Sequence, residues 1–263
     1  MSKTILFVHG AWVTPDCWSH FRTYYEALGY RCEAPAWPFL DRPASALRDQ
    51  PDPLLSGLTI KALVDHFEQH IKELPEAPIL IGHSFGGLIV QMLLDRGLGC
   101  AGVAIDAGPP RGVLPSPRAI LSALPVLLTW LGWRRVHTMS FKGFSNTFAN
   151  GVPPALQQQT YDRYIVPAPG RIYFQAALGI GNGVNFSNPK RAPLLLVAGD
   201  NDRTSTPSMV RAMFRKHSRA ASRTDIMTFA GRSHWLISEP GWEELAERVA
   251  RWIDLHTRST PPI

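Results

Sequence analysis

A serine flanked by glycines, between an apolar run and a run with helical spacing, is the feature that most constrains how this chain can fold. Residues 79–81 are apolar, residues 82–87 read Gly-His-Ser-Phe-Gly-Gly, and residues 88–94 are amphipathic. Glycine at positions 82 and 86 lacks the β-carbons that would collide in a sharp turn from a strand into a helix. Such a turn lifts a serine hydroxyl clear of the backbone. We therefore predict that Ser84 is a nucleophile on a strand-to-helix turn.

Strand-like and helix-like segments alternate along the chain on both sides of this turn. The residue patterns predict strands at residues 4–8, 31–35, 79–81, 102–106, 194–198 and 225–229. Apolar residues at helical spacing follow Thr59, which is expected to cap a helix that stops at Pro75, and they recur in residues 242–253. Gly29 is expected to end an earlier helix. This alternation is typical of an α/β chain with a mostly parallel central sheet flanked by helices.

Regular alternation stops between Asp106 and residue 194. About eighty residues intervene where a bare crossover needs about a dozen. We predict that residues 1–108 and 190–263 form the α/β core and that residues 109–189 are an inserted helical cap. Within it, the apolar residues 119–133 are interrupted by Pro125 and are too short to span a bilayer. They predict either a buried helix pair or an apolar lid over a substrate pocket.

Composition narrows the functional classes. The chain has 27 Lys and Arg against 21 Asp and Glu, a net charge of +6, but no aromatic-interleaved basic stripe accompanies this excess. We therefore expect no nucleic-acid partner. A strand-like run begins at residue 4 without a leader, and Cys17, Cys32 and Cys100 suggest neither a disulfide framework nor a zinc site, so a cytoplasmic protein is favoured. The tail, residues 259–263, is predicted to be frayed.

A serine nucleophile needs a general base, and chain order narrows the choice of histidine. Hydrolytic sheets of this kind supply serine, acid and histidine in that order. Only His217, His234 and His256 follow the last strand that could carry the acid, and the first and third of them lie in predicted helices. His234 instead follows a strand in a turn, where a loop can carry an imidazole over the strand ends. We predict that His234 is the base.

The acid that orients this histidine is expected just beyond the carboxyl end of a neighbouring strand. Asp202 is our first choice, because it stands three residues after Gly199 and has enough chain to turn inward. Asp200 directly follows the glycine and is better placed to cap the turn. Asp106 lies at the end of another strand and could reach the same histidine. Asp200 and Asp106 therefore remain alternatives.

Two backbone amides are expected to bind the negative charge that develops on a substrate oxygen. The first belongs to Phe85, the residue after the serine. The second is expected in the loop after the first strand, where Gly10 lets the backbone approach a substrate and Ala11 supplies the N–H. Trp12 supplies it instead if the turn is shifted by one residue. His9 is predicted to be a structural histidine that bonds to its own loop.

Four motifs occur together in one order: His9-Gly10, the turn at residues 82–86, Gly199-x-x-Asp202 and Gly231-x-x-His234. In this the chain resembles the α/β-hydrolases over essentially its whole length apart from the predicted cap. The resemblance implies an α/β-hydrolase fold and a Ser-His-Asp mechanism that needs no cofactor. The loop at residues 9–11 also resembles that of small esterases and hydroxynitrile lyases of plants and their bacterial relatives. It departs from lipases with a Gly-Gly-Gly oxyanion loop, which weakens a case for bulky tertiary-alcohol esters.

The motifs together predict a serine hydrolase that cleaves a carboxylic ester of a small or medium apolar substrate through an acyl-enzyme, with water as co-substrate. Two other classes remain open. The same triad could serve a hydroxynitrile lyase, a carbon–carbon bond hydrolase or a perhydrolase, and Lys142 would then be the lysine near a lyase pocket. The chain could also be a small-molecule receptor without catalytic activity.

Aromatic and histidine side chains supply further candidates. The predicted pocket residues are Trp12, Trp130, Phe141, Phe144 and Trp235. His66 and His70 have the helical spacing of two metal ligands, but no third ligand is near them in the sequence. We predict that these two histidines border an apolar helix face and that the chain holds no metal.

Overall fold

Six parallel strands form the central sheet of the computed structural model, which describes residues 3–257. The strands are β1 (Thr4–Val8), β2 (Arg31–Glu33), β3 (Ile79–His83), β4 (Ala101–Ile105), β7 (Leu194–Gly199) and β8 (Thr224–Phe229). Their order across the sheet is β2-β1-β3-β4-β7-β8. The predicted α/β class with a mostly parallel sheet is confirmed. The predicted frayed tail, residues 259–263, lies outside the described residues.

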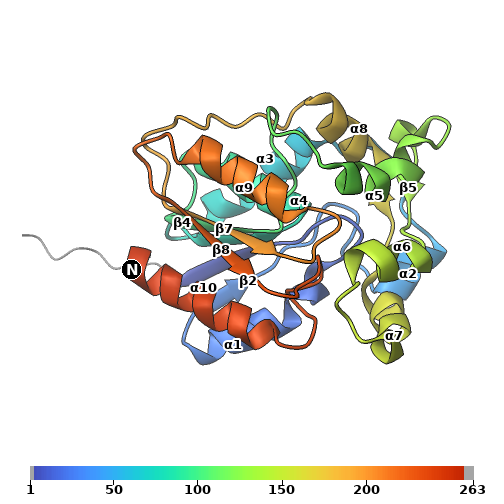
Figure 1. The fold of residues 1–263 in the computed structure, drawn as a ribbon, viewed down its shortest axis with the longest axis horizontal. Coiled ribbons are helices and arrows are strands. Elements are labelled where there is room, and N and C mark those ends of the chain that lie inside the picture. Colours follow the sequence, from blue (N-terminus) through green and yellow to red (C-terminus); the bar gives the residue numbers. More distant parts are fainter. Residues whose placement is uncertain (1–2, 258–263) are drawn as a thin grey trace, which may run out of the picture.

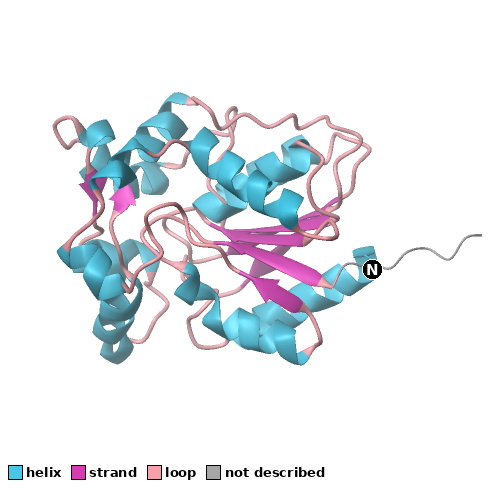
Figure 2. Cartoon of the chain, turned by 180° about the vertical axis from the view of Figure 1, so that it is seen from behind, coloured by secondary structure: helices cyan, strands magenta, loops and turns pink. Residues whose placement is uncertain are grey.

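Helices cover both faces of this sheet. The helices α3 (Ile60–Glu73), α4 (Phe85–Asp95) and α9 (Pro207–His217) lie on one face, and α1 (Ser19–Ala27) and α10 (Trp242–Thr257) lie on the other (Figure 1). Figure 2 shows the same layers from behind. The central strands are buried along their whole length, which explains why their sequences are continuously apolar.

Local sequence signals set several of the element boundaries. The Thr59 side chain accepts a hydrogen bond from the backbone N–H of Ala62 at 3.0 Å and caps α3. Gly29 follows α1 with a φ of 86°, as expected of a residue that ends a helix. The strand β2 ends two residues earlier than predicted, because Pro35 has no N–H to donate to a neighbouring strand.

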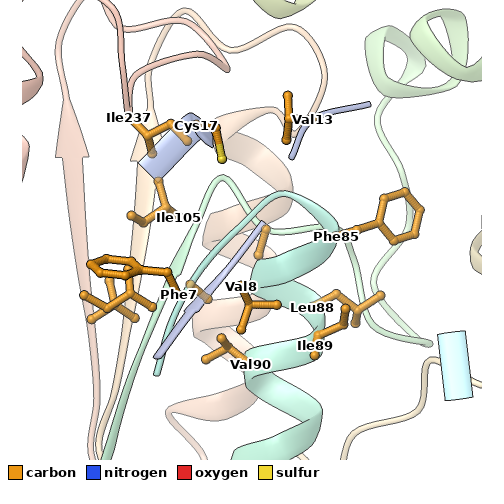
Figure 3. Close-up of a cluster of buried hydrophobic side chains, with 14 of the residues drawn as sticks. Phe7, Val8, Val13, Cys17, Phe85, Leu88, Ile89, Val90, Ile105 and Ile237 are labelled. Atoms are coloured by element: carbon orange, nitrogen blue, oxygen red, sulfur yellow. The ribbon is translucent and has the colours of Figure 1, made fainter. Parts of the chain in front are cut away.

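A layer of buried apolar side chains joins β1 to α4. Figure 3 shows Val8 beside Ile89 and Val90 in this layer, while Phe7, the preceding residue, points to the opposite side of the strand. Phe85, at the start of α4, points away from the layer. The side chains of α4 therefore anchor the helix, and its first residue is left to face another part of the molecule.

The chain between β4 and β7 forms α5 (Pro117–Leu127), α6 (Phe141–Gly143), α7 (Pro154–Tyr164) and α8 (Gly170–Leu178), with the short strands β5 (Val136–His137) and β6 (Ala168–Pro169) paired antiparallel. These helices gather at one end of the molecule, together with α2 (Ala44–Asp49) (Figure 1). We call residues 109–189 the cap, after the predicted inserted segment. No helix in the described part of the chain combines the length and apolarity needed to cross a membrane.

Candidate active site

Ser84 lies at the turn between β3 and α4 in a backbone conformation that few non-glycine residues adopt. Its φ is 57° and its ψ is −122°. A β-carbon at Gly82 would overlap the carbonyl oxygen of Gly86, and a β-carbon at Gly86 would overlap the carbonyl oxygen of Val8. The turn is therefore packed tightly on both sides. The surrounding atoms keep the backbone of Ser84 in this strained conformation and so fix the position of its side chain.

His234 lies in the loop after β8, and its imidazole is hydrogen bonded to a carboxylate. Its Nδ1 donates to Oδ2 of Asp202 over 2.7 Å, and both side chains are fully buried. The Oδ1 of Asp202 accepts from the backbone N–H groups of Thr204 at 2.6 Å and Ser205 at 3.0 Å. With the proton on Nδ1, Nε2 of His234 carries a free lone pair. That Nε2 is buried and has no hydrogen-bond partner among the described residues.

His83, the residue before Ser84, holds the His234 loop against the serine turn. Its Nε2 donates to the backbone carbonyl of His234 over 2.7 Å, and the two ring centroids lie 4.6 Å apart. Burial lowers the pKa of His83 well below its ordinary value, so this imidazole is neutral. On the same loop, Glu239 accepts hydrogen bonds from the backbone N–H of Ser233, at 3.0 Å, and from its hydroxyl. These contacts fix His234 beside the turn.

Asp106 follows β4 and lies close to Asp202 and His234, but it does not hydrogen bond to the imidazole. Ligand atoms of the three side chains lie within 4.8 Å of one another. Oδ1 of Asp106 accepts from the backbone N–H of Gly199 at 2.9 Å, and its buried Oδ2 has no hydrogen-bond partner in the described chain. Burial, and then the charge of Asp202, raise the pKa of Asp106 well above its ordinary value. A neutral acid cannot balance an imidazolium charge, so this arrangement favours Asp202 as the acid.

Asp200, the other alternative acid, joins the turns after β7 and β8. Its Oδ1 accepts from the backbone N–H of Gly231.

The cluster of Asp106, Asp202 and His234 is compact enough to be considered for a metal ion. Its donor set is poor, however, because Nδ1 carries a proton and the raised pKa of Asp106 favours its protonated form, whereas metal ligands must be deprotonated.

The loop after β1 approaches the serine turn closely. A β-carbon at Gly10 would lie 2.8 Å from the β-carbon of Ser84, so glycine is required there. The backbone N–H of Ala11, next in this loop, makes no hydrogen bond within residues 3–257. Phe85 is the first residue of α4, where backbone N–H groups lack a partner within the helix. The two amides predicted to bind an oxyanion are thus both uncommitted.

Trp12 and His9, in the same loop, have structural partners. The indole N–H of Trp12 donates to the backbone carbonyl of His137 at 2.9 Å. Nδ1 of His9 donates to the carbonyl of Gly10 at 2.9 Å, and its Nε2 accepts from the backbone N–H of Trp37 at 3.0 Å. Burial lowers the pKa of His9 to about 4, so the ring is neutral at pH 7. His9 braces its own loop, in the position that the sequence predicts for a structural histidine.

A cavity opens at Ser84 between the sheet and the cap. It encloses about 770 Å³, including its open mouth, and α5 and α8 supply two of its walls. Small side chains on these helices leave the space open: Ala119, Ala123, Ala176 and Ala177. None of the described residues that line the cavity is charged. One side of α5 therefore forms part of the cavity wall while another side is exposed, so this helix is not part of a buried helix pair.

Polar groups in the cavity wall are mostly committed to the backbone. The hydroxyls of Ser122, Thr204 and Ser205 donate to carbonyl oxygens. Tyr173 of α8 packs its ring against Trp12 and Phe85, with ring centroids 4.8 and 5.1 Å apart. Burial raises the pKa of Tyr173 well above its ordinary value, so its hydroxyl stays protonated. The wall is therefore apolar and aromatic next to the serine.

Of the five aromatic residues predicted for the pocket, Trp12 lines the cavity and the other four do not. Trp130 is 79% exposed on the outer surface. Phe141 and Phe144 pack against Tyr161, and Trp235 is buried against Phe148 and Tyr164. Aromatic side chains serve helix packing as readily as ligand binding, so residue type alone does not indicate which of them line a cavity.

Lys142, considered as the lysine of a lyase pocket, has an exposed side chain on α6 and does not line the cavity.

His66 and His70 border the buried face of α3, as predicted. His66 bonds through Nε2 to the backbone carbonyl of Ala36 at 3.0 Å, and His70 pairs with Glu33 at 2.7 Å. One ring nitrogen of each histidine is therefore engaged by a protein group.

Comparisons with known proteins agree with the fold described above. The model of the family described as "Alpha/beta hydrolase family" matches residues 5–248. The chain belongs to the alpha/beta hydrolase family. A curated relative of this hydrolase is Methylesterase 2 of Arabidopsis thaliana, 34% identical over 90 residues, which are 34% of this chain and 30% of that protein. The match thus spans less than a third of the relative's length.

Solved structures of several other proteins have a similar fold. The monoacylglycerol lipase of Paleococcus ferrophilus superposes on this hydrolase with a TM-score of 0.68 at 20% identity, covering 97% of this chain and 95% of that one. The methylesterase MES16 from Arabidopsis gives a TM-score of 0.66 at 15% identity, covering 96% and 99%. Tomato Methylketone Synthase I gives 0.69 at 12% identity, covering 98% and 100%. At these identities the likeness establishes the shared fold.

Proposed function

We propose that this hydrolase cleaves carboxylic esters through a covalent intermediate on Ser84. The observation that carries the proposal is a serine on a strained turn, lining an uncharged cavity, beside a buried His234–Asp202 pair whose Nε2 is free. The local match to a protein named Methylesterase 2 supports an ester as the substrate. A serine oxygen, an imidazole base and an oriented carboxylate are the groups that acyl transfer needs.

In the proposed reaction, Nε2 of His234 takes the proton of Ser84 as the serine oxygen attacks the carbonyl carbon of the ester. Asp202 balances the imidazolium charge, and the N–H groups of Phe85 and Ala11 donate to the oxyanion. The imidazolium then gives its proton to the leaving alcohol, which leaves the acyl group on Ser84. Water attacks this acyl-enzyme by the same route and releases the acid.

The cavity wall supports an uncharged, apolar substrate. A carboxylate or ammonium group on the substrate would lose its hydration in the cavity without gaining a charged partner, which costs several kcal/mol by order of magnitude. Alanines on α5 and α8 instead leave room for an acyl chain or a ring against Tyr173. We therefore propose esters of small or medium apolar acids.

A panel of p-nitrophenyl esters tests this substrate class. Replacing Ala123 by Trp places an indole in the cavity, so we expect kcat/KM for the octanoate to fall by about tenfold or more while that for the acetate changes by less than about threefold. Leu121→Trp, on the outer face of the same helix, is the matched control and should change neither value. Equal effects of Ala123→Trp on both esters, or efficient cleavage of a succinate monoester, would contradict the proposed class.

A further inference from the structure

The net charge of the chain is concentrated in the cap. Residues 109–189 contain seven Lys or Arg and a single acidic residue, Asp162. The difference between these counts equals the whole net charge of +6. The rest of the chain contains twenty basic and twenty acidic residues and is neutral overall. Basic residues are not especially dense in the cap, and it is the absence of acids from residues 107–161 that creates the imbalance. A field of one sign at one end of a molecule selects a partner of the opposite sign.

The basic side chains of the cap are not used to hold the fold together by ion pairs. Within residues 3–257, all the ion pairs join residues outside the cap, for example Arg96 with Glu68 and Arg248 with Glu244. Arg111, Arg118, Arg134, Arg135 and Lys142 are exposed instead, with no ion pair in this part of the structure. Arg134 and Arg135 line a surface hollow that also contains Asp52, without an ion pair to it, and the five charges remain open to an external anion.

Exposed apolar side chains lie close in the sequence to Arg118, Arg134 and Arg135. Leu121 lies on α5 and Leu128 follows its last residue, and because they are seven residues apart they lie on the same side of the helix. The opposite side of the helix carries Ala119 and Ala123 and lines the cavity. Leu128 is 77% exposed and Trp130, just beyond it, is 79% exposed. Scattered exposed leucines are ordinary, but two exposed leucines on one side of a helix, followed within a few residues by an exposed tryptophan, indicate an interaction site.

We propose that this face, made of Leu121, Leu128 and Trp130 and flanked by Arg118, Arg134 and Arg135, docks onto a lipid surface with anionic headgroups. An amphipathic helix that combines leucine, tryptophan and arginine lies in the headgroup region with its apolar side toward the acyl chains. Arginines next to it gain from the negative potential of the surface. The docking surface is separate from the reacting residues and does not depend on the proposed function.

Docking would place the cavity next to the lipid phase. The helix α5 has one face on the cavity and the other in the docking surface, so the two sites are a helix diameter apart, about 10 Å. An apolar molecule dissolved among acyl chains could then enter the cavity without crossing bulk water. Docking would thus account for the exposed leucines of α5, which the packing of the cap does not explain.

Co-sedimentation with vesicles tests the proposal. We expect the full chain to bind vesicles of equal parts phosphatidylglycerol and phosphatidylcholine, and to bind vesicles of phosphatidylcholine alone at least about tenfold more weakly. Arg134→Gln with Arg135→Gln should weaken binding to the anionic vesicles by about fivefold per charge removed. Leu121→Ser with Leu128→Ser should weaken it by about tenfold or more.

Matched controls separate docking from general effects of charge and hydrophobicity. Leu255→Ser, on α10, removes a leucine that is 73% exposed outside the cap, and Arg219→Gln removes an exposed basic residue from the turn after α9. Both variants should bind as the wild type does. Ser84→Ala should also bind unchanged, which keeps this test apart from that of the proposed function. Hydrolysis of dissolved p-nitrophenyl acetate checks that the surface variants are folded.

Three results would overturn the proposal. One is equal binding to the two kinds of vesicle, and another is no binding to either. The third is a dimer in sedimentation velocity that Leu121→Ser with Leu128→Ser dissociates, because the face would then be covered by a second copy of this chain.

Discussion

Replacing Ser84 by Ala is expected to lower kcat for p-nitrophenyl butyrate by about 10⁴-fold or more. The proposed reaction passes through a bond to the serine oxygen, and without it only the amides and the cavity remain to assist direct attack by water. Steady-state kinetics on the purified protein measure the loss. Far-UV circular dichroism and the unfolding midpoint should show that the fold is retained, because the change removes a single oxygen atom.

Ser122→Ala is the matched control for this result. Ser122 also lines the cavity, but its hydroxyl donates to the carbonyl of Ala119 within α5. Its loss should change kcat by less than about threefold. Undiminished activity in Ser84→Ala, or an equal loss in the two serine variants, would remove Ser84 from the proposed mechanism.

Asp202→Asn and Asp106→Asn are expected to differ by orders of magnitude although the two carboxyl groups share one buried cluster. An amide at position 202 cannot balance an imidazolium and favours the wrong tautomer of His234, so kcat should fall by about 10⁴-fold. The raised pKa of Asp106 favours its neutral form, and asparagine can accept the same hydrogen bond from Gly199. Asp106→Asn should therefore lose less than about tenfold, and steady-state kinetics measure both losses. The reverse order would make Asp106 the acid.

Stability against pH gives a second measure of the charge state of Asp106. The groups that face it are Asp202, His234 and Glu239, and its raised pKa means that the native state keeps a proton that the unfolded chain releases above about pH 4. This contribution to stability is present at low pH and is lost as pH rises. Asp106→Asn should therefore unfold at a higher temperature than the wild type at pH 7, with the difference shrinking toward pH 4. An unchanged difference would show that Asp106 is ionised.

The sequence could predict the parts of this site that depend on backbone geometry. The glycines at 82 and 86 indicate a turn in which a β-carbon has no room, and the structure has that turn. Chain order and strand position chose His234 and Asp202 from several candidates, and the structure brings these two side chains to within 2.7 Å. Such signals are local, since they follow from glycine spacing and from the few residues that come after each strand.

The cavity wall could not be predicted in this way, because it depends on how the cap packs. Ala119 and Ala123 on α5 carry no chemical signal, and they matter because they are small where α8 faces them. Trp235 follows the proposed base directly, yet it is buried against Phe148. Asp106 differs again, because its position at a strand end was visible but its neutral state follows from burial beside Asp202.

The central claim is that Ser84 is the nucleophile, and mass spectrometry after treatment with a fluorophosphonate tests it most directly. We expect one adduct per chain, on the peptide that contains Ser84, with slower labelling in His234→Ala and none in Ser84→Ala. An adduct on another residue, or equal labelling of the wild type and Ser84→Ala, would contradict the account.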